Sequence, residues 1–100
     1  MNVNELTDII GTSKKPVIGV FSASWCGPCR MFAPKFESVS KRLGNEFVFA
    51  KIDADECEEL CESYGIASVP TIIMFINGVE AKRKGGAFAT EADFEKWIKG

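Results

Sequence analysis

The sequence contains no histidine. This absence excludes Ser-His and Cys-His catalysis, histidine-ligated metal sites and any proton shuttle through an imidazole ring. The sequence also has no excess of basic residues, because 12 Lys and Arg stand against 14 Asp and Glu. A nucleic-acid binder needs concentrated positive charge to displace counterions from phosphates, so we expect no nucleic-acid partner.

Long apolar runs are missing as well. The longest, residues 17–21 and 72–76, fall far short of the ~18 residues that a membrane span requires. The first 15 residues show no basic segment followed by an apolar run, which is the pattern of a secretory signal. We therefore expect a cytoplasmic protein that does not contact a membrane. A reducing compartment favours catalytic or metal-binding cysteines over structural disulfides.

The chain does contain enough apolar side chains for a core, since 46% of its 100 residues are hydrophobic. A chain of this length forms one domain, and we assign residues 1–100 to it. The spacing of the apolar positions distinguishes helical from extended segments. Helices are predicted near residues 3–10, 29–43, 55–64 and 90–98, and strands near residues 17–21, 47–52, 71–76 and 79–84.

The order of these segments is α-β-α-β-α-β-β-α. Strands that a helix separates are expected to run parallel to each other. Asn77 and Gly78 are typical of a type I′ hairpin turn, which adds one antiparallel edge strand. The sequence therefore predicts a three-layer α/β domain in which four helices flank a mixed four-stranded sheet.

Two of the four cysteines, Cys26 and Cys29, stand where the first predicted strand passes into the second predicted helix. Cys26 is expected at the exposed helix N-terminus. Free amides and the helix dipole favour a thiolate there and lower a thiol pKa from about 8.5 to roughly 3.5–7.5. Cys29, one turn further, is expected inside the core. This arrangement predicts an attacking and a resolving thiol that cycle between dithiol and disulfide.

A zinc site is the alternative interpretation of the cysteines. It would use all four, Cys26, Cys29, Cys57 and Cys61, as thiolate ligands. We favour two separate pairs and no metal, because 27 residues separate the pairs and the second pair lies on a helix face that packs the core. Cys57 and Cys61 are predicted to be buried, inert thiols, with a regulatory disulfide between them as the alternative.

Several motifs follow one another in an order that resembles a thioredoxin over essentially the whole chain. They are FSAS and WCGPC at residues 21–29, Pro34, KIDAD, SVPT, the Asn77-Gly78 turn and the glycine pair before Ala87. The resemblance implies the thioredoxin fold and a protein-disulfide reductase that needs no bound cofactor. It also implies recycling by thioredoxin reductase with electrons from NADPH, substrates such as peroxiredoxins, a monomeric state, and a role in electron transport and cell redox homeostasis.

The resemblance also assigns residues around the two sulfurs. Cys26 corresponds to the attacking cysteine, Cys29 to the resolving one, and Pro70 to a cis-proline that aligns an extended substrate. The surface expected to dock substrates consists of Trp25, Gly27, Pro28, Val69, Pro70 and Gly86. An oxidase, an isomerase and a binding module without turnover are the alternatives to a reductase.

The sequence departs from the family in three places. The family's N-terminal strand is expected to be missing, which leaves the strand at residues 47–52 at an edge of the sheet. Gly85 and Gly86 stand where the family has one glycine and a bulkier residue, so we expect a more mobile loop. Val20 replaces a buried aspartate that helps to deprotonate the resolving cysteine, and Lys51 thereby loses its partner. We expect Val20 and Lys51 to modulate the rate of resolution.

Overall fold

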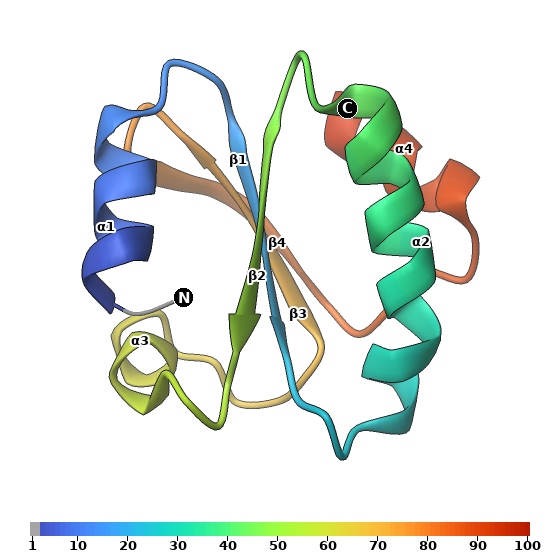
Figure 1. Ribbon diagram of the computed structural model, residues 1–100, viewed down its shortest axis with the longest axis horizontal. Coiled ribbons are helices and arrows are strands. Elements are labelled where there is room, and N and C mark those ends of the chain that lie inside the picture. The colour runs from blue at the N-terminus through green and yellow to red at the C-terminus, as the bar shows by residue number, and fades with distance from the viewer. Residues whose placement is uncertain (1–2) are drawn as a thin grey trace.

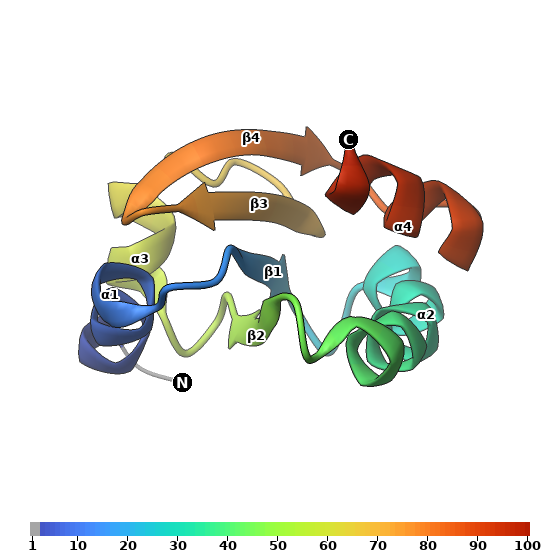
Figure 2. The ribbon, with the colours of Figure 1, turned by 90° about the horizontal axis from the view of Figure 1, so that it is seen from above.

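The computed structural model describes residues 3–100, and the side chains from residue 5 onward. Within these residues one four-stranded sheet lies between two pairs of helices (Figure 1). The elements are α1 (Val3–Thr12), β1 (Val17–Ser22), α2 (Gly27–Leu43), β2 (Val48–Asp53), α3 (Glu58–Ser63), β3 (Thr71–Ile76), β4 (Val79–Gly85) and α4 (Glu91–Lys99). Figure 2 shows α1 and α3 on one face of the sheet and α2 and α4 on the other. The predicted three-layer α/β architecture is confirmed.

The sheet has a core on each face because the central strands β1 and β3 are apolar on both sides. Successive side chains of a strand point to opposite faces. Val20 of β1 therefore packs with Phe32 of α2 in the cluster that α2 and α4 cover. Phe21 packs with Leu60 of α3 in the cluster that α1 and α3 cover. This alternation turns Val20 toward the helix that carries Cys29.

The strand order β2-β1-β3-β4 includes one direction that the sequence analysis predicted wrongly. β1 and β2 run parallel, but β3 runs antiparallel to β1. The reason is length, because α3 with its six residues rises only about 9 Å, whereas a six-residue strand spans about 20 Å. α3 therefore cannot return the chain to the end of the sheet where β1 and β2 begin. The 17-residue α2, about 25 Å long, can do so.

The reversal of β3 gathers several chain segments at one end of the sheet. Ser22 at the end of β1 pairs with Asp53 at the end of β2, and Phe21 lies opposite Thr71, the first residue of β3. Thr71 in turn pairs with Gly85 at the end of β4. The loops that follow β1 and β2 and the loop that precedes β3 consequently meet at the lower end of the molecule in Figure 1.

Two helix boundaries differ from the predictions. α1 continues one residue past Gly11, which was expected to end it. α3 begins at Glu58, with Cys57 as its N-cap, rather than at Asp55. Asp55 instead lies in a turn after β2, where its backbone N–H donates to the Asp53 carboxylate Oδ1 at 2.9 Å. A short acidic side chain that closes a turn in this way competes with helix initiation.

The hairpin and the edge strand agree with the sequence analysis. Asn77 and Gly78 have φ values of 53° and 83°, as a type I′ turn requires. β2 lies at an edge of the sheet, and no strand among residues 3–100 pairs with its outer side. Within the same residues no helix has the length and apolar character needed to cross a membrane.

Candidate active site

Cys26 forms the N-cap of α2. Its backbone is extended, with φ -89° and ψ 118°, and its Sγ accepts a hydrogen bond from the Cys29 backbone N–H at 3.3 Å. Pro28 stands in the first helical turn, where its missing N–H removes no helical hydrogen bond. The Cys26 thiol also donates to the Val69 carbonyl oxygen at 3.7 Å. The capping N–H and the positive end of the helix dipole both stabilise a thiolate at this sulfur.

Cys26 is less exposed than the sequence analysis expected. Its exposed fraction is 6%, against 5% for Cys29, so exposure does not distinguish the two cysteines. The physical reason is the loop before β3, from which Val69 packs against a small cluster of Ala23, Cys26 and Cys29. The two cysteines differ instead in their position along α2, because Cys26 caps the helix and Cys29 lies inside its first turn.

The Cys29 thiol holds its proton more strongly than an ordinary thiol. Burial raises its pKa, and the hydrogen bond and negative charge of Cys26 raise the pKa further. A backbone hydrogen bond at Ala23 acts in the opposite direction but does not cancel these effects. Both cysteines are free thiols in this structure. Burial and the neighbouring Cys26 thus keep the Cys29 thiol protonated.

The Val69–Pro70 peptide bond is cis, as the resemblance implied for Pro70. Pro70 itself is buried, and its carbonyl oxygen accepts the Gly86 N–H at 2.8 Å. Gly86 has a φ of 87°, which a residue with a side chain rarely adopts. The loop after β4 is thereby tied to the loop that faces Cys26. The greater mobility expected for Gly85 and Gly86 stays a prediction.

Exposure around the two sulfurs is uneven. Trp25 is 68% exposed, and Pro28 is exposed as well. Gly27, Val69 and Gly86 are half-buried. The expected position of Trp25 on the surface, rather than in the core, is confirmed. Its role in docking a substrate stays a prediction.

Trp25 is held by a residue that the sequence analysis did not single out. Its indole Nε1–H donates to the Asp55 carboxylate Oδ2 at 2.9 Å. The sequence did contain a signal for this contact. β1 and β2 are parallel neighbours, so the residues that follow them lie side by side at one end of the sheet. The sequence analysis placed Asp55 only at the start of the third predicted helix.

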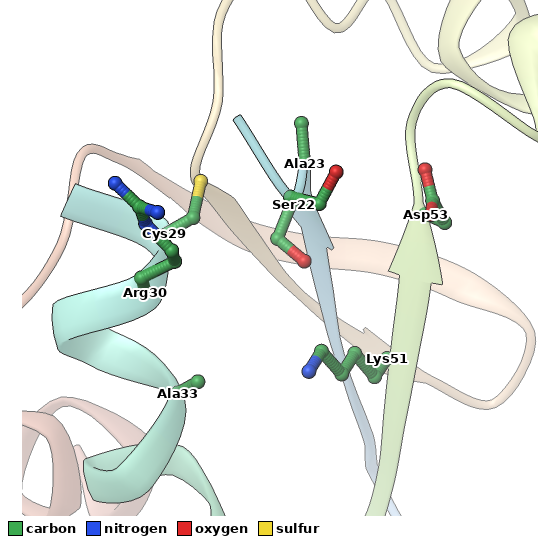
Figure 3. Close-up of a pocket in the computed structure, with 8 residues that line it drawn as sticks. Ser22, Ala23, Cys29, Arg30, Ala33, Lys51 and Asp53 are labelled. Carbon is green, nitrogen blue, oxygen red and sulfur yellow. The ribbon is translucent and has the colours of Figure 1, made fainter. Parts of the chain in front are cut away.

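A pocket of about 270 Å³ opens beside Cys29 (Figure 3). It lies between the start of α2 and the ends of β1 and β2. Its lining consists of Ser22, Ala23, Ser24, Cys29, Arg30, Ala33, Lys51 and Asp53. Figure 3 shows the Lys51 side chain reaching from β2 across β1 toward α2, with Cys29 and Asp53 on opposite sides of the pocket.

A narrower gap of about 20 Å³ lies deeper between β1 and α2. Its lining includes Val20, Cys29, Glu37 and Lys51. Val20 is 3% exposed and stands where the resemblance implies a carboxylate. The structure thus brings Val20 and Lys51 together with Cys29, although Lys51 is itself exposed. Their effect on the rate of resolution stays a prediction.

The second cysteine pair lies at the start of α3. Cys57 is buried, with 4% exposed, and Cys61 is half-buried. Burial raises the pKa of the Cys61 thiol, and the neighbouring Cys57, Glu58 and Asp55 raise it further. The predicted burial of this pair is therefore confirmed for Cys57 and reached only in part by Cys61.

The two cysteine pairs do not form one metal site. Cys26 and Cys29 pack in their own small cluster, whereas Cys57 packs in the core that α1 and α3 cover. Over residues 3–100, no three His, Cys, Asp or Glu side chains are arranged to hold a metal ion. A zinc site built from all four cysteines is thus inconsistent with the fold.

The chain is similar in sequence to known thioredoxins. The family profile described as Thioredoxin matches residues 1–100. A thioredoxin of Mycobacterium tuberculosis is 40% identical over 81 residues, which cover 81% of this chain and 69% of that protein. A thioredoxin of Mycoplasmoides gallisepticum is 39% identical over 85% of this chain and 83% of its own length. A bifunctional thioredoxin reductase/thioredoxin of Mycobacterium leprae is 41% identical over 76 residues, and the match spans only 17% of that protein.

Solved structures show the same likeness. Plasmodium falciparum thioredoxin superimposes with a TM-score of 0.89 and 35% identity, over 98% of this chain and 92% of that one. Fasciola hepatica thioredoxin gives a TM-score of 0.88 and 33% identity over the same shares. The match over the whole chain, the likeness of fold and the paired thiols at the start of α2 agree. The chain belongs to the thioredoxin family of thiol–disulfide oxidoreductases.

Proposed function

We propose that the protein is a general protein-disulfide reductase. The Cys26 thiolate attacks one sulfur of a substrate disulfide, so that a mixed disulfide forms and the other substrate sulfur leaves as a thiolate. Cys29 then loses its proton and attacks the Cys26 Sγ, which closes the Cys26–Cys29 disulfide and releases the reduced substrate. The observation that carries this proposal is the hydrogen bond from the Cys29 N–H to the Cys26 Sγ at the start of α2.

The substrate is proposed to dock as an extended segment beside Cys26. Trp25 and Pro28 offer exposed apolar surface there, and Val69 presents its backbone to the sulfur. The complete proposed surface is Trp25, Gly27, Pro28, Val69, Pro70 and Gly86. Because Pro70 is buried, it contributes through the conformation of the loop rather than through side-chain contact.

Electrons are proposed to come from NADPH through thioredoxin reductase. The support is the Mycobacterium leprae relative, whose name joins a thioredoxin reductase and a thioredoxin. On the resemblance to the family we also propose one domain over residues 1–100, a cytoplasmic monomer, peroxiredoxins among the substrates, and a role in electron transport and cell redox homeostasis. NADPH oxidation by a thioredoxin reductase, with this protein and insulin present, tests the recycling step.

Insulin reduction by dithiothreitol tests the reductase itself. The protein should accelerate the precipitation of the reduced insulin chain, and Cys26→Ser should abolish the acceleration. Cys29→Ser should form a lasting mixed disulfide without turnover. Cys61→Ser is the matched control and should keep close to the original rate. No acceleration by the unmodified protein would indicate a binding module, and preferential oxidation of reduced peptides would indicate an oxidase or isomerase.

A further inference from the structure

Resolution of the mixed disulfide requires a proton acceptor for Cys29. The thiol is buried, and its raised pKa means that only a small fraction is a thiolate near neutral pH. The side chain next to it on β1 is Val20, which cannot accept a proton. The gap between Val20 and Cys29, about 20 Å³, has room for about one water molecule. Another group must therefore take the proton.

Two carboxylates share a cavity lining with Cys29. Asp53, at the end of β2, lines the pocket of about 270 Å³, and Glu37, on α2, lines the narrow gap. The other charged side chains that face the same space are the cations Arg30, from α2, and Lys51, from β2. Beyond Cys26 itself, these four residues make up the charged and titratable lining around Cys29.

Three observations favour Asp53 over Glu37. Asp53 is half-buried and its Oδ1 accepts the Asp55 N–H at 2.9 Å, so its carboxylate is held in one orientation at the edge of the pocket. Glu37 is exposed on a helix surface, where its longer side chain is free to turn toward solvent. The pocket beside Asp53 has polar side chains in part of its lining, namely Ser22, Ser24, Arg30 and Lys51, and it is large enough for several water molecules. The gap beside Glu37 is narrow and lined mainly by apolar side chains.

We propose that Asp53 accepts the proton of Cys29 through water in this pocket, and so replaces the carboxylate that the chain lacks at Val20. This inference rests on the proposed reductase function. The Cys29 proton passes to water and then to the Asp53 carboxylate, while the Cys29 sulfur bonds to the Cys26 Sγ. The bond between Cys26 and the substrate breaks, and the substrate leaves as a thiolate. Asp53 then returns its proton to solvent, and Lys51 favours the transient Cys29 thiolate.

Stopped-flow reaction with 5,5′-dithiobis(2-nitrobenzoic acid) isolates this step. Cys26 releases the first thionitrobenzoate in a phase that depends on reagent concentration, and Cys29 releases the second in a phase that does not. Asp53→Asn keeps an oxygen for the Asp55 N–H, so the turn is preserved. We expect this variant to slow the second phase about tenfold at about pH 6, less than the loss of a base in direct contact would cause. The difference should vanish near pH 9, where hydroxide removes the proton.

The sign of the change separates proton transfer from simple electrostatics. If Asp53 acted only through its negative charge, its removal would favour the thiolate and speed the second phase. An equal or faster second phase in Asp53→Asn therefore overturns the proposal. Asp53→Glu should recover most of the rate, and Glu37→Gln should not slow it. A slowing in Glu37→Gln alone would assign the role to Glu37 and also overturn the proposal.

The same experiment also tests the proposed reductase function independently of Asp53. Cys29→Ser should lack the second phase entirely. If the unmodified protein lacked it, or if Cys29→Ser retained it, the proposed function would fail regardless of Asp53. Thermal unfolding midpoints close to that of the unmodified protein are required of each variant, so that a slow second phase cannot be caused by partial unfolding.

Discussion

Each of the two cysteine pairs begins at the N-cap of a helix, but the hydrogen bonds and charges around the two pairs differ. Cys26 caps α2 and Cys57 caps α3. The Cys26 sulfur accepts the N–H of Cys29, whereas within the described residues the Cys57 side chain makes no capping hydrogen bond to its helix. The first turn of α2 carries no acidic residue, and the first turn of α3 carries Glu58 and Glu59.

The contrast indicates that the charges beside a helix N-cap, and not the N-cap position alone, decide whether a thiolate is favoured there. Carboxylates such as Glu58 and Glu59 stabilise a short helix, because they complement the positive end of its dipole. The same negative charges oppose a thiolate beside them, and Glu58 contributes to the raised pKa of Cys61. The start of α2 is thus arranged to stabilise a thiolate, whereas the start of α3 keeps the Cys61 thiol protonated.

Alkylation with iodoacetamide should give the largest difference between the pairs. At pH 7 we expect Cys26 to react on the order of 100-fold faster than Cys57 or Cys61, because only the thiolate is the nucleophile. Since burial raises the pKa of Cys29 and Cys61, their labelling should rise about tenfold per pH unit up to their pKa. Timed quenching with peptide mapping measures each site. Faster labelling of Cys29 or Cys57 than of Cys26 would contradict the comparison.

Hydrogen peroxide tests whether the second pair is regulatory. We expect the Cys26–Cys29 disulfide to form first, at a rate roughly tenfold or more above any reaction at Cys57 or Cys61. A disulfide between Cys57 and Cys61 requires the start of α3 to unwind, because a helix holds residues four apart near the upper limit of Cα separation. Intact mass and disulfide mapping decide the order. A Cys57–Cys61 bridge that forms before other damage would support a regulatory role.

Val20→Asp tests whether proton removal from Cys29 limits the reaction of the Cys26–Cys29 pair. A carboxylate beside Cys29 should speed mixed-disulfide decay severalfold near neutral pH, and more so in an Asp53→Asn background. It should also lower the free energy of unfolding by at least about 1 kcal/mol, because a polar group is buried incompletely satisfied. Rapid quenching and urea unfolding measure the two effects. Val20→Asn is the control, with similar destabilisation and no acceleration. Unchanged decay in Val20→Asp would mean that proton removal does not limit the rate.

We expect the smallest effect on stability at the contact between the loop before α2 and the loop before α3. Asp55→Ala removes the acceptor of the Trp25 indole N–H, which is an exposed hydrogen bond. We expect a change in unfolding free energy of no more than about 0.5 kcal/mol. Quenching of Trp25 fluorescence by acrylamide should nevertheless increase, measured in a Trp97→Phe background that leaves Trp25 as the sole tryptophan. Glu56→Ala is the control, because it removes a negative charge from the adjacent residue, and it should leave the quenching unchanged. An increase in both variants would exclude the hydrogen bond as its cause.

Local features of the fold could be predicted from the sequence. The apolar run of β1, the Asn77-Gly78 turn and the cysteine spacing at the start of α2 are each decided by residues a few positions apart. The direction of β3 could not be predicted, because it depends on where α3 begins. Asp55 looks like a helix cap in the sequence, but it binds Trp25, which is 30 positions away.

In the candidate site, too, the local features could be predicted from the sequence and the contacts between distant segments could not. The positions of Cys26 and Cys29 at the start of α2 could be predicted from their spacing, whereas the burial of Cys26 could not. Val69 covers that sulfur from a loop 43 positions along the chain. The pocket that brings Asp53 to Cys29 also depends on the pairing of β1 with β2. The spacing of residues within one helix is enough to predict a candidate cysteine pair. Contacts between loops that are distant in the sequence can be found only once the fold is known.

The gathering of the reactive loops at one end of the sheet leaves the opposite end free of them. That opposite end holds the Asn77-Gly78 hairpin and the turns that join α1 to β1 and α2 to β2 (Figure 1). Ile76 and Val79, which flank the hairpin, are 41% and 67% exposed. The molecule therefore has a natural attachment point. An affinity tag, a fluorophore or a surface tether inserted at this hairpin would hold the protein with its cysteine pair facing away from the support.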